Sequence, residues 1–359
     1  MKKSLVALAV LGTLAGTAAA QSSVTAFGVV DLNVRYVKEN GQSLWAQGTD
    51  GNQSSRLGFR GVEDLGGGMK AGFWLESGLN PNTGTTSSTS NLSGTQLFTR
   101  RATVSLMGDF GEVRLGRAKT GERTIIDDFD PFGTIGVGGV ITLYNAFAAI
   151  PGKQNAANAI DTGATWNRSN NQFAYILPGD LGGFYGQVDV APGQGAATLD
   201  NKYYGGRIGY KDGPIHVTAG FSSNYGNASK FNMGSVAGSY DFGVATGQVL
   251  FTQQSYNGLK QNLITVAAIV PMGQNIFRAG FTHNDANDAA RNAGLAFNAN
   301  LFAVGYEYDL SKRTALYTTV SEVTNQGKGK VAVTTAPGSL VMAPGGKSGG
   351  AEVGIRHSF

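Results

Sequence analysis

The chain has 359 residues, including 54 Gly and 9 Pro, and only 14% of its residues are charged. It contains no Cys, which excludes disulfide scaffolds, thiol nucleophiles and Cys-ligated metal sites. Glycine is present at about twice its usual share. Because Gly destabilises helix interiors, this composition argues against a mainly helical protein.

The first twenty residues have the pattern of a secretory signal peptide. Two lysines follow Met1, residues 5–14 form an apolar stretch, and the segment ends with three alanines at residues 18–20. We predict that residues 1–20 are removed and that the mature protein comprises residues 21–359. Loss of the two lysines lowers the formal charge from +4 to +2, and so nearly neutral a chain is not expected to bind nucleic acid. No later apolar run approaches the ~20 residues that a membrane helix needs.

Downstream of the leader, apolar and polar residues alternate in the manner of β-strands. Between Val24 and Tyr36 every second residue is apolar or Gly. Asp31, Asn33 and Arg35 lie on the opposite face. The same period of two recurs in three later segments, at residues 184–190, 215–222 and 352–359. In three further segments the pattern does not decide which residues lie on which face of the strand: residues 230–241, 261–270 and 314–322.

Short turns and longer linkers alternate along the chain and allow the strands to be counted. Seven short turns have the Gly, Asp, Asn or Pro residues of hairpins, at residues 64–68, 108–111, 178–183, 211–214, 241–243, 271–275 and 309–313. Eight longer polar linkers separate them, at residues 39–53, 78–96, 119–163, 191–201, 223–229, 253–260, 284–298 and 325–348. An even count of about sixteen strands, with short connections on one side and long ones on the other, is typical of outer-membrane barrels.

We therefore predict an all-β fold, namely a 16-stranded antiparallel transmembrane β-barrel without a domain boundary. In hydrocarbon every backbone N–H and C=O group must be paired, and a closed barrel satisfies this demand because it has no edge. Alternation places water-facing and lipid-facing residues on the two surfaces, consistent with the mean hydropathy of −0.10. A barrel of this size is too wide for side chains to fill, so an aqueous channel remains.

Aromatic residues near the predicted strand ends would supply the girdles that such barrels place at both membrane interfaces. In a soluble β-protein the same residues would fill a core instead. The candidates are Tyr36, Phe59, Phe73, Tyr203, Tyr210, Phe221, Tyr240, Phe251, Phe281, Tyr306 and Tyr308.

Several short pieces of the sequence, in their order and spacing, resemble one known family. They are Ser22–Thr25, Ser55–Gly61, Glu63–Gly68, Arg100–Ala102, Leu115–Arg117, Asp130–Gly133 and Gly354–Phe359. Each piece alone is a weak signal. Together they resemble the trimeric general porins of Gram-negative bacteria, and most closely the β-proteobacterial branch. The resemblance extends from the leader to the last residue.

This resemblance implies a homotrimer in the outer membrane of a Gram-negative bacterium. Ions and small hydrophilic solutes would diffuse passively through its water-filled pore, without a cofactor. Contacts with outer-membrane lipid and lipopolysaccharide are implied, as is insertion by the barrel-assembly machinery, which would read the terminal Phe359. Phe359 would equally suit an aromatic girdle, and the two roles are compatible.

In such porins the third external loop folds into the barrel and narrows it. The longest interior linker, residues 119–163, has this place in the chain, and loops of such length are usually functional. The resemblance places acidic loop residues on one side of the constriction: Asp127, Asp128 and Asp130. It places basic wall residues opposite them: Arg56, Arg60, Arg100 and Arg168. The resulting transverse field would order water and disfavour apolar solutes, while ions pass hydrated.

Two positions do not follow the family pattern simply. The family has the first residue of the Arg100–Arg101 pair in the pore, whereas strict alternation puts Arg100 on the face of Val104. A loop buried against this inner wall would make it apolar and would reconcile the two interpretations. We expect Arg100 in the pore, with Arg101 in reserve. The acidic element has Asp130 before Pro131 rather than an acid after it, which leaves the identity of the facing acid open.

The candidate arginines equal or outnumber the candidate aspartates, so we predict a weak anion preference unless several of these charges pair and cancel. A substrate-specific channel and a surface adhesin or receptor are the alternatives. Enzymatic activity is not expected, because His216, His283 and His357 have no nucleophile signature nearby. The acidic groups near His283 and Asp127 lack the spacing of a calcium loop, and no metal site is predicted.

Overall fold

The computed structural model describes residues 23–86, 97–148, 166–192, 202–225, 230–294, 297–334, 340 and 342–359. The predicted signal peptide, residues 1–20, lies outside the described residues, and so does part of the third external loop. Within the described ranges, no helix is long and apolar enough to cross a membrane.

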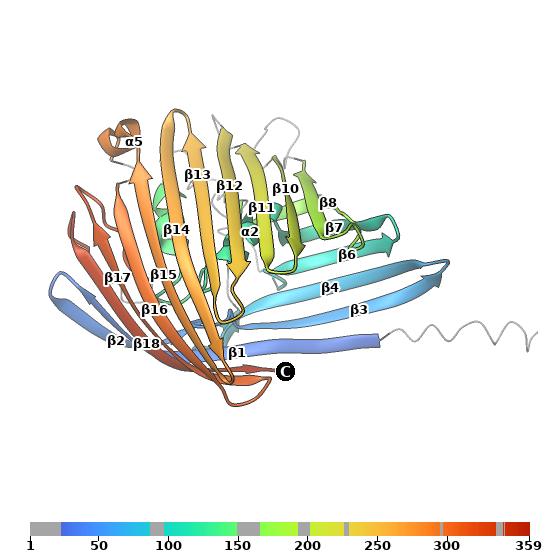
Figure 1. Ribbon diagram of the computed structural model, residues 1–359, viewed down its shortest axis with the longest axis horizontal. Coiled ribbons are helices and arrows are strands. Elements are labelled where there is room, and N and C mark those ends of the chain that lie inside the picture. The colour runs from blue at the N-terminus through green and yellow to red at the C-terminus, as the bar shows by residue number, and fades with distance from the viewer. Residues whose placement is uncertain are drawn as a thin grey trace, which may run out of the picture.

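Sixteen antiparallel strands form one closed barrel, which confirms the predicted fold class (Figure 1). They are β1 (Ser23–Glu39), β3 (Arg56–Gly66), β4 (Met69–Asn80), β6 (Arg101–Gly108), β7 (Gly111–Lys119), β8 (Arg168–Ile176), β9 (Phe184–Ala191), β10 (Tyr203–Asp212), β11 (Ile215–Tyr225), β12 (Lys230–Asp241), β13 (Thr246–Tyr256), β14 (Leu259–Met272), β15 (Asn275–Ala286), β16 (Ala299–Asp309), β17 (Thr314–Asn325) and β18 (Lys347–Ser358). The external loops add β2 (Gln42–Thr49), β5 (Thr85–Thr86) and the short helix α5 (Asp288–Asn292).

The first and last strands close the ring. Residues 29–39 of β1 pair with β18, and residues 23–29 pair with β3 on the other side. At this seam Gly28 and Phe359 exchange two backbone hydrogen bonds of 3.0 Å. A β-carbon on Gly28 would overlap the Phe359 ring, so the close approach requires glycine. Closure pairs the edges of the sheet, as a hydrocarbon environment demands.

The inner and outer faces follow the predicted alternation. In β1, Asp31 is fully buried, whereas Val34 is 50% exposed on the outer surface. In β9, β11 and β18 the apolar residues Val188, Val217 and Val353 are exposed in the same way. These exposed apolar side chains form the surface that lipid covers. The polar residues that alternate with them in each strand line the lumen.

The three segments whose facing the sequence left open have apolar residues on both faces. In β12, Phe231 and Met233 are buried toward the lumen while Val236 is exposed on the outer surface. Leu263 of β14 and Val323 of β17 are buried in the same manner. These inner residues belong to one hydrophobic cluster with the third external loop, which explains why alternation is blurred there.

One of the eight predicted long linkers is wrong. Residues 253–260 form no loop, because β13 runs to Tyr256 and β14 begins at Leu259. The tight turn between them consists of Asn257 and Gly258, whose φ angles are 48° and 81°. Asn and Gly are the residues that adopt such positive angles most easily in hairpin turns.

The third external loop connects β7 to β8 and folds into the barrel, as predicted (Figure 1). Its first helix is α2 (Gly121–Phe129), capped by Thr120, whose hydroxyl accepts a hydrogen bond of 3.2 Å from the Arg123 N–H. Pro131 follows the helix and prevents its continuation. The helix lies against β9–β13, and a second helix, α3 (Ile141–Ala148), follows it.

The packing of this loop against the inner wall forms the main hydrophobic core. Its buried loop residues are Ile125, Ile126, Phe129, Val137, Val140, Leu143, Tyr144, Phe147 and Trp166. A polar link adds to them, since the Ser235 hydroxyl of β12 donates to the carboxylate of the fully buried Glu122. Burial raises the pKa of Glu122 to about 8. The core and this link hold the loop inside the lumen.

Several predicted girdle residues lie on the outer surface, but Tyr203 does not. Phe59, Phe221 and Tyr240 are exposed there. Tyr203 is buried on the inner parity of β10, and its hydroxyl donates to Asp189 at 3.3 Å. Its assignment to a girdle is wrong, because aromatic character alone does not tell a lumen residue from a lipid-facing one.

Candidate functional site

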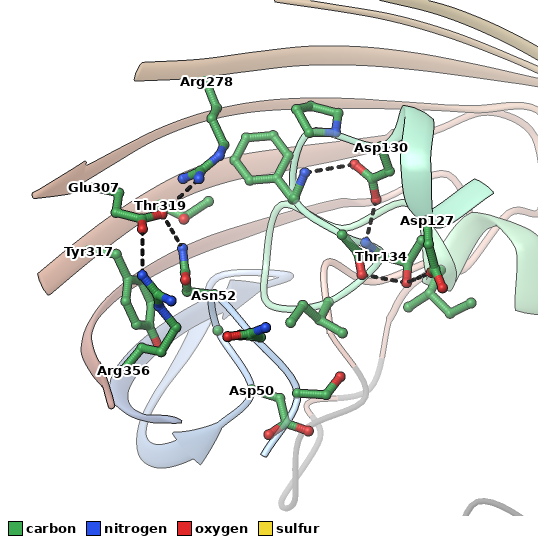
Figure 2. Close-up of a pocket in the computed structure, with 18 of the residues that line it drawn as sticks. Asp50, Asn52, Asp127, Asp130, Thr134, Arg278, Glu307, Tyr317, Thr319 and Arg356 are labelled. Carbon is green, nitrogen blue, oxygen red and sulfur yellow. Dashed lines mark hydrogen bonds and ion pairs between the residues drawn. The ribbon is translucent and has the colours of Figure 1, made fainter. Parts of the chain in front are cut away.

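A cavity of about 990 Å³ lies between the third loop and the barrel wall (Figure 2). The third loop contributes residues 130–135 to it, the first external loop contributes residues 50–54, and the strands supply most of the rest. Among the described residues, seven basic and four acidic side chains line it: Arg56, Arg100, Lys119, Arg123, Arg168, Arg278 and Arg356, with Asp50, Asp127, Asp130 and Glu307.

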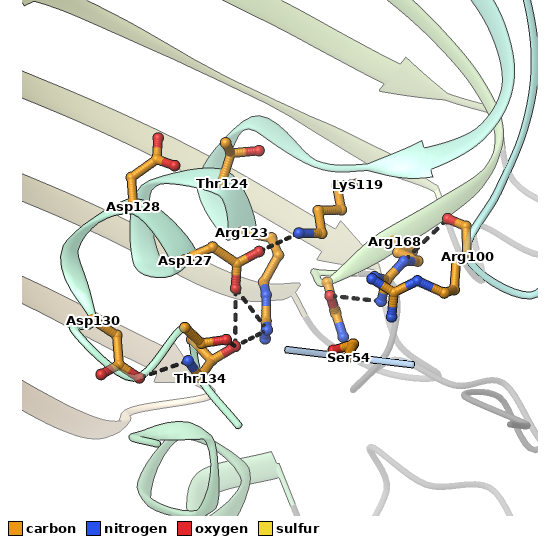
Figure 3. Close-up of polar contacts among 12 residues, drawn as sticks. Ser54, Arg100, Lys119, Arg123, Thr124, Asp127, Asp128, Asp130, Thr134 and Arg168 are labelled. Carbon is orange, nitrogen blue, oxygen red and sulfur yellow. Dashed lines mark hydrogen bonds and ion pairs between the residues drawn. The ribbon is translucent and has the colours of Figure 1, made fainter. Parts of the chain in front are cut away.

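Three of the predicted basic residues line one side of this cavity, and Figure 3 shows two of them side by side. Arg168 Nε donates to the Arg100 carbonyl at 3.1 Å. Arg100 Nε lies 2.5 Å from Glu76 Oε1, and Arg56 Nε lies 4.0 Å from the same oxygen. Arg100 precedes β6, which begins at Arg101. Strand alternation therefore does not govern the direction of Arg100.

Asp127 lies in α2 at the edge of the cavity, and its charge is compensated within the loop region. Its carboxylate pairs with Arg123 at 2.8 Å and with Lys119 at 2.5 Å. The Thr134 hydroxyl donates to it at 2.9 Å. Burial raises the pKa of Asp127, but the two cations outweigh burial and hold this pKa below its usual value. Asp127 is consequently ionised at neutral pH.

Asp130 shapes the loop from a buried position at the cavity wall. Its carboxylate accepts backbone hydrogen bonds from Phe132 at 3.1 Å, Thr134 at 2.8 Å and Val140 at 3.0 Å. Burial raises the pKa of Asp130 to about 6. These bonds join the end of α2 to the start of α3, so the residue holds the turn between the helices.

Asp128 points away from this cavity, on the other side of α2 (Figure 3). It pairs with Arg207 of β10 at 3.2 Å and lines a second cavity of about 500 Å³. Burial raises its pKa. The three candidate aspartates therefore have three different surroundings, although they lie within four consecutive residues of the sequence.

Arg60 and Arg101 do not line the 990 Å³ cavity. The Arg60 Cζ lies 5.3 Å from the ring centre of Phe27 and 5.1 Å from that of Trp74. The Arg101 Cζ lies 4.6 Å from the same Trp74 ring, and its Nε donates to Thr103 Oγ1 at 2.9 Å. The two arginines form a separate group on the inner wall.

The wall formed by β15–β18 and β1 contains an ion-pair network that the sequence pattern did not reveal (Figure 2). Glu307 lies 2.7 Å from Arg278 and 2.9 Å from Arg356. Arg35 and Glu352 pair at 2.7 Å in the same part of the wall. Each arginine here has a carboxylate partner.

Charges inside the predicted strands are the signal that would have revealed these residues and Glu76. A Lys or Arg on the lipid face of a barrel strand costs about 2–4 kcal/mol at mid-membrane, so a strand charge is expected in the lumen. Which charges meet there depends on the register between strands, and alternation along a single strand does not give that register.

The chemistry that this arrangement supports is electrostatic. The cavity has room for on the order of 30 water molecules, at about 30 Å³ each, and its basic side chains outnumber its acidic ones. Among the residues that the structure describes, no three acidic, His or Cys side chains lie together as metal ligands would. The cavity therefore acts on a hydrated solute through the electric field of its charged side chains, and not through coordinating ligands.

The sequence matches the family described as Gram-negative porin over residues 7–328. The chain belongs to this family. It is 37% identical over 378 residues to outer membrane porin protein 32 of Delftia acidovorans, with 100% of both chains covered. It is 26% identical to a major outer membrane protein P.IB of Neisseria meningitidis, also with full coverage of both.

Solved structures support the assignment to the porin family. The anion-selective porin from Comamonas acidovorans is 34% identical and aligns with a TM-score of 0.80, covering 94% of this porin and 100% of that chain. A trimer form of OmpT from Vibrio cholerae is 14% identical, with a TM-score of 0.62 over 94% of this porin and 99% of that chain; it shares the fold. This porin is an outer-membrane channel protein of a Gram-negative bacterium, through which solutes diffuse passively.

Proposed function

We propose that this porin passes ions and small hydrophilic solutes with a weak preference for anions, and that the 990 Å³ cavity is its constriction. One observation carries the proposal: seven basic side chains face four acidic ones among the described residues of the cavity lining. The 34% identical anion-selective porin from Comamonas acidovorans supports the same preference. A lumen with an excess of one sign concentrates ions of the other sign.

The preference is expected to be weak for two reasons. The cavity is wide enough for ions to keep their water, so little dehydration energy discriminates between them. Several lining charges also compensate one another, as Asp127 does with Arg123 and Lys119. The arginines that exceed their carboxylate partners, Arg168 among them, supply the net potential.

The test is the reversal potential across planar bilayers in a KCl gradient. Arg56→Ala removes one lining charge and should lower the chloride-to-potassium permeability ratio by about two- to threefold, the effect of a unit charge at ~14 Å in water acting on the two ions with opposite signs. Arg313→Ala removes the same charge from an exposed short turn and should leave the ratio unchanged. A parent channel that prefers potassium would contradict the proposal.

Saturable block of the current by one class of solute would favour the substrate-specific alternative. The proposal also contains no catalytic step, and hydrolysis of model esters or peptides by the purified protein would count against it.

We also propose a homotrimer. The trimer form of OmpT from Vibrio cholerae supports it through the shared fold, as do the exposed apolar side chains on the barrel's outer surface, which offer area for contact between barrels. Chemical cross-linking in native membranes should give a three-subunit limit, and a product that stops at one subunit would contradict the trimer.

Phe359 is proposed as the signal for the barrel-assembly machinery. It directly follows β18, lies at the closing seam and is 49% exposed in the closed barrel. Phe359→Ser should reduce the amount of assembled protein in the outer membrane by severalfold. Phe242→Ser changes another exposed aromatic, in a short turn, and serves as the control. Equal assembly of the two variants would leave Phe359 as a girdle residue only.

A further inference from the structure

A row of aromatic and arginine side chains crosses the inner wall beside the constriction. It consists of Phe27 of β1, Arg60 of β3, Trp74 of β4 and Arg101 of β6. Arg60 and Arg101 reach Trp74 from the two strands that flank β4, with their Cζ atoms 5.1 and 4.6 Å from its ring centre. Phe27 and Trp74 meet edge to face at 5.1 Å.

Strand parity places this row in the lumen. Phe59 and Phe73, the neighbours of Arg60 and Trp74, are exposed on the outer surface, so the row points inward. Thr103 shares the parity of Arg101 and is buried. Gly58 leaves the space that the Phe27 ring fills, because a β-carbon there would overlap it.

The charges of this row differ from those of the constriction. Arg56 and Arg100 share the carboxylate of Glu76, whereas no carboxylate of the described residues lies within ion-pair distance of Arg60 or Arg101. A Trp ring attracts both guanidinium groups through its quadrupole without neutralising them. The ring contacts thus hold two like charges near each other, and neither charge has a direct ion-pair partner among the described residues.

The guanidinium groups also remain available to a ligand. Among the described residues, Arg101 Nε donates to Thr103, and the other guanidinium N–H groups of Arg60 and Arg101 have no hydrogen-bond acceptor. The planar fork of a guanidinium matches the two oxygens of a carboxylate or a phosphate better than it matches a spherical ion. The row therefore suits small oxyanions.

One end of the row, at Arg60, lies away from the 990 Å³ cavity, while Arg101 at the other end directly follows the cavity residue Arg100. Arg60 lies four residues nearer the short turn of β3 than Arg56 does, which corresponds to about 13 Å at ~3.3 Å per residue. An anion on its way between the constriction and the short-turn end of the barrel passes this row.

We propose that Arg60 and Arg101 form a second anion-binding step in the lumen, selective for small oxyanions, with Trp74 as the residue that positions both arginines. The step rests on the proposed anion preference and refines it. The indole N–H donates to Glu76 at 3.0 Å, so Trp74 also connects the row to the arginine–carboxylate group of the constriction.

The experiment measures block of the chloride current by inorganic phosphate in single-channel recordings. Trp74→Leu removes the aromatic faces and should weaken phosphate block about threefold or more. Trp74→Phe keeps a smaller aromatic ring and loses the N–H, so block should stay within about twofold of the parent. Trp45→Leu is the matched control, at an exposed tryptophan in the external strand β2. Phosphate should block this variant as strongly as it blocks the parent channel.

Arg60→Lys separates geometry from charge. It keeps the positive charge and loses the planar fork, so phosphate block should weaken about threefold while the reversal potential in KCl stays at the parent value. Channels of all variants are scored by open-channel conductance, which shows that each barrel has formed. Phosphate block of parental strength in Trp74→Leu or in Arg60→Lys would overturn the proposal. That result together with a selectivity loss in Arg56→Ala would leave the constriction proposal standing.

Discussion

Arginine has different surroundings on the two sides of the 990 Å³ cavity. On the wall of β15–β18 and β1, three arginines have three nearby carboxylates: Arg278 and Arg356 with Glu307 and Asp309, and Arg35 with Glu352. On the side that contains β3, β8 and the residue before β6, three arginines line the cavity. Arg56 and Arg100 share the carboxylate of Glu76, whereas Arg168 has no ion-pair partner among the described residues.

The paired wall contributes mainly to stability, and the side with fewer carboxylates contributes mainly to the electrostatic potential in the lumen. A fully paired wall adds little net potential, and removal of one partner leaves a charge that is partly out of water. The under-paired side creates the potential that an ion senses. A count of arginines in the sequence therefore overestimates the net positive potential in the lumen, because it includes arginines that are paired with carboxylates.

The largest expected effect comes from breaking the paired wall. Glu307→Gln leaves Arg278 and Arg356 without their shared carboxylate, and the free energy of unfolding should fall by about 3 kcal/mol. Urea unfolding of the folded protein in detergent measures it. Glu322→Gln removes an exposed partner of Lys347 and should cost no more than about 0.5 kcal/mol. Equal losses in the two variants would remove the distinction between the walls.

Glu122 is a buried carboxyl group that has no arginine partner among the described residues. The folded-state pKa of Glu122 is about 8, above the value of 4.5 for an exposed Glu, so the folded protein holds this proton more tightly than the unfolded chain does. The resulting stabilisation is complete below pH 4.5 and is lost as the pH rises through about 8. Between pH 7 and pH 9 the loss should be about 1.4 kcal/mol.

Glu122→Gln should abolish this pH dependence, because a neutral amide can keep the contact with Ser235. Unfolding by urea at pH 7 and pH 9 measures the difference. Glu63→Gln, at an exposed position, should retain the parental loss between these pH values. A parent whose stability is the same at both pH values would contradict the protonated state of Glu122.

The smallest expected effect concerns ion selectivity. Arg168→Gln removes one charge from the under-paired side and should lower the chloride-to-potassium permeability ratio by about twofold. The double variant Arg278→Gln/Glu307→Gln removes one charge of each sign from the paired wall and should leave the ratio unchanged. Reversal potentials measure both. A shift of equal size in the double variant would show that pairing on that wall does not cancel its field.

Much of the fold could be predicted because lipid and water impose a period of two. Asp31 and Val34 lie on the expected faces of β1. The rule fails where a distant segment supplies a third environment: Phe231 and Met233 face the lumen, yet they meet the apolar side of the third loop and not water. Tertiary packing of this kind leaves no local trace in the sequence.

The turn at Asn257 and Gly258 was missed although its signal is local. An Asn-Gly pair between alternating segments is a strong hairpin signal, and the prediction of a loop there gave more weight to the surrounding polar residues. Strand length on the external side is therefore better judged from turn residues than from polarity.

Less of the candidate site could be predicted. Arg56, Arg100 and Arg168 do line one cavity, but Arg60 lies in a separate group and Asp128 in a second cavity. Alternation in the sequence predicts which face of its strand a charged residue occupies. It does not give the height at which neighbouring strands place it or the partner that it meets, since both depend on register.

The seam between β1 and β18 has a consequence for biogenesis. Arg35 and Glu352, which pair across this seam, are separated by 317 positions, so the ring cannot be completed until nearly the whole polypeptide has crossed the inner membrane. Until then the exported chain has two bare strand edges and an apolar exterior, both prone to association with other chains. The topology thus leaves those surfaces exposed until the seam closes.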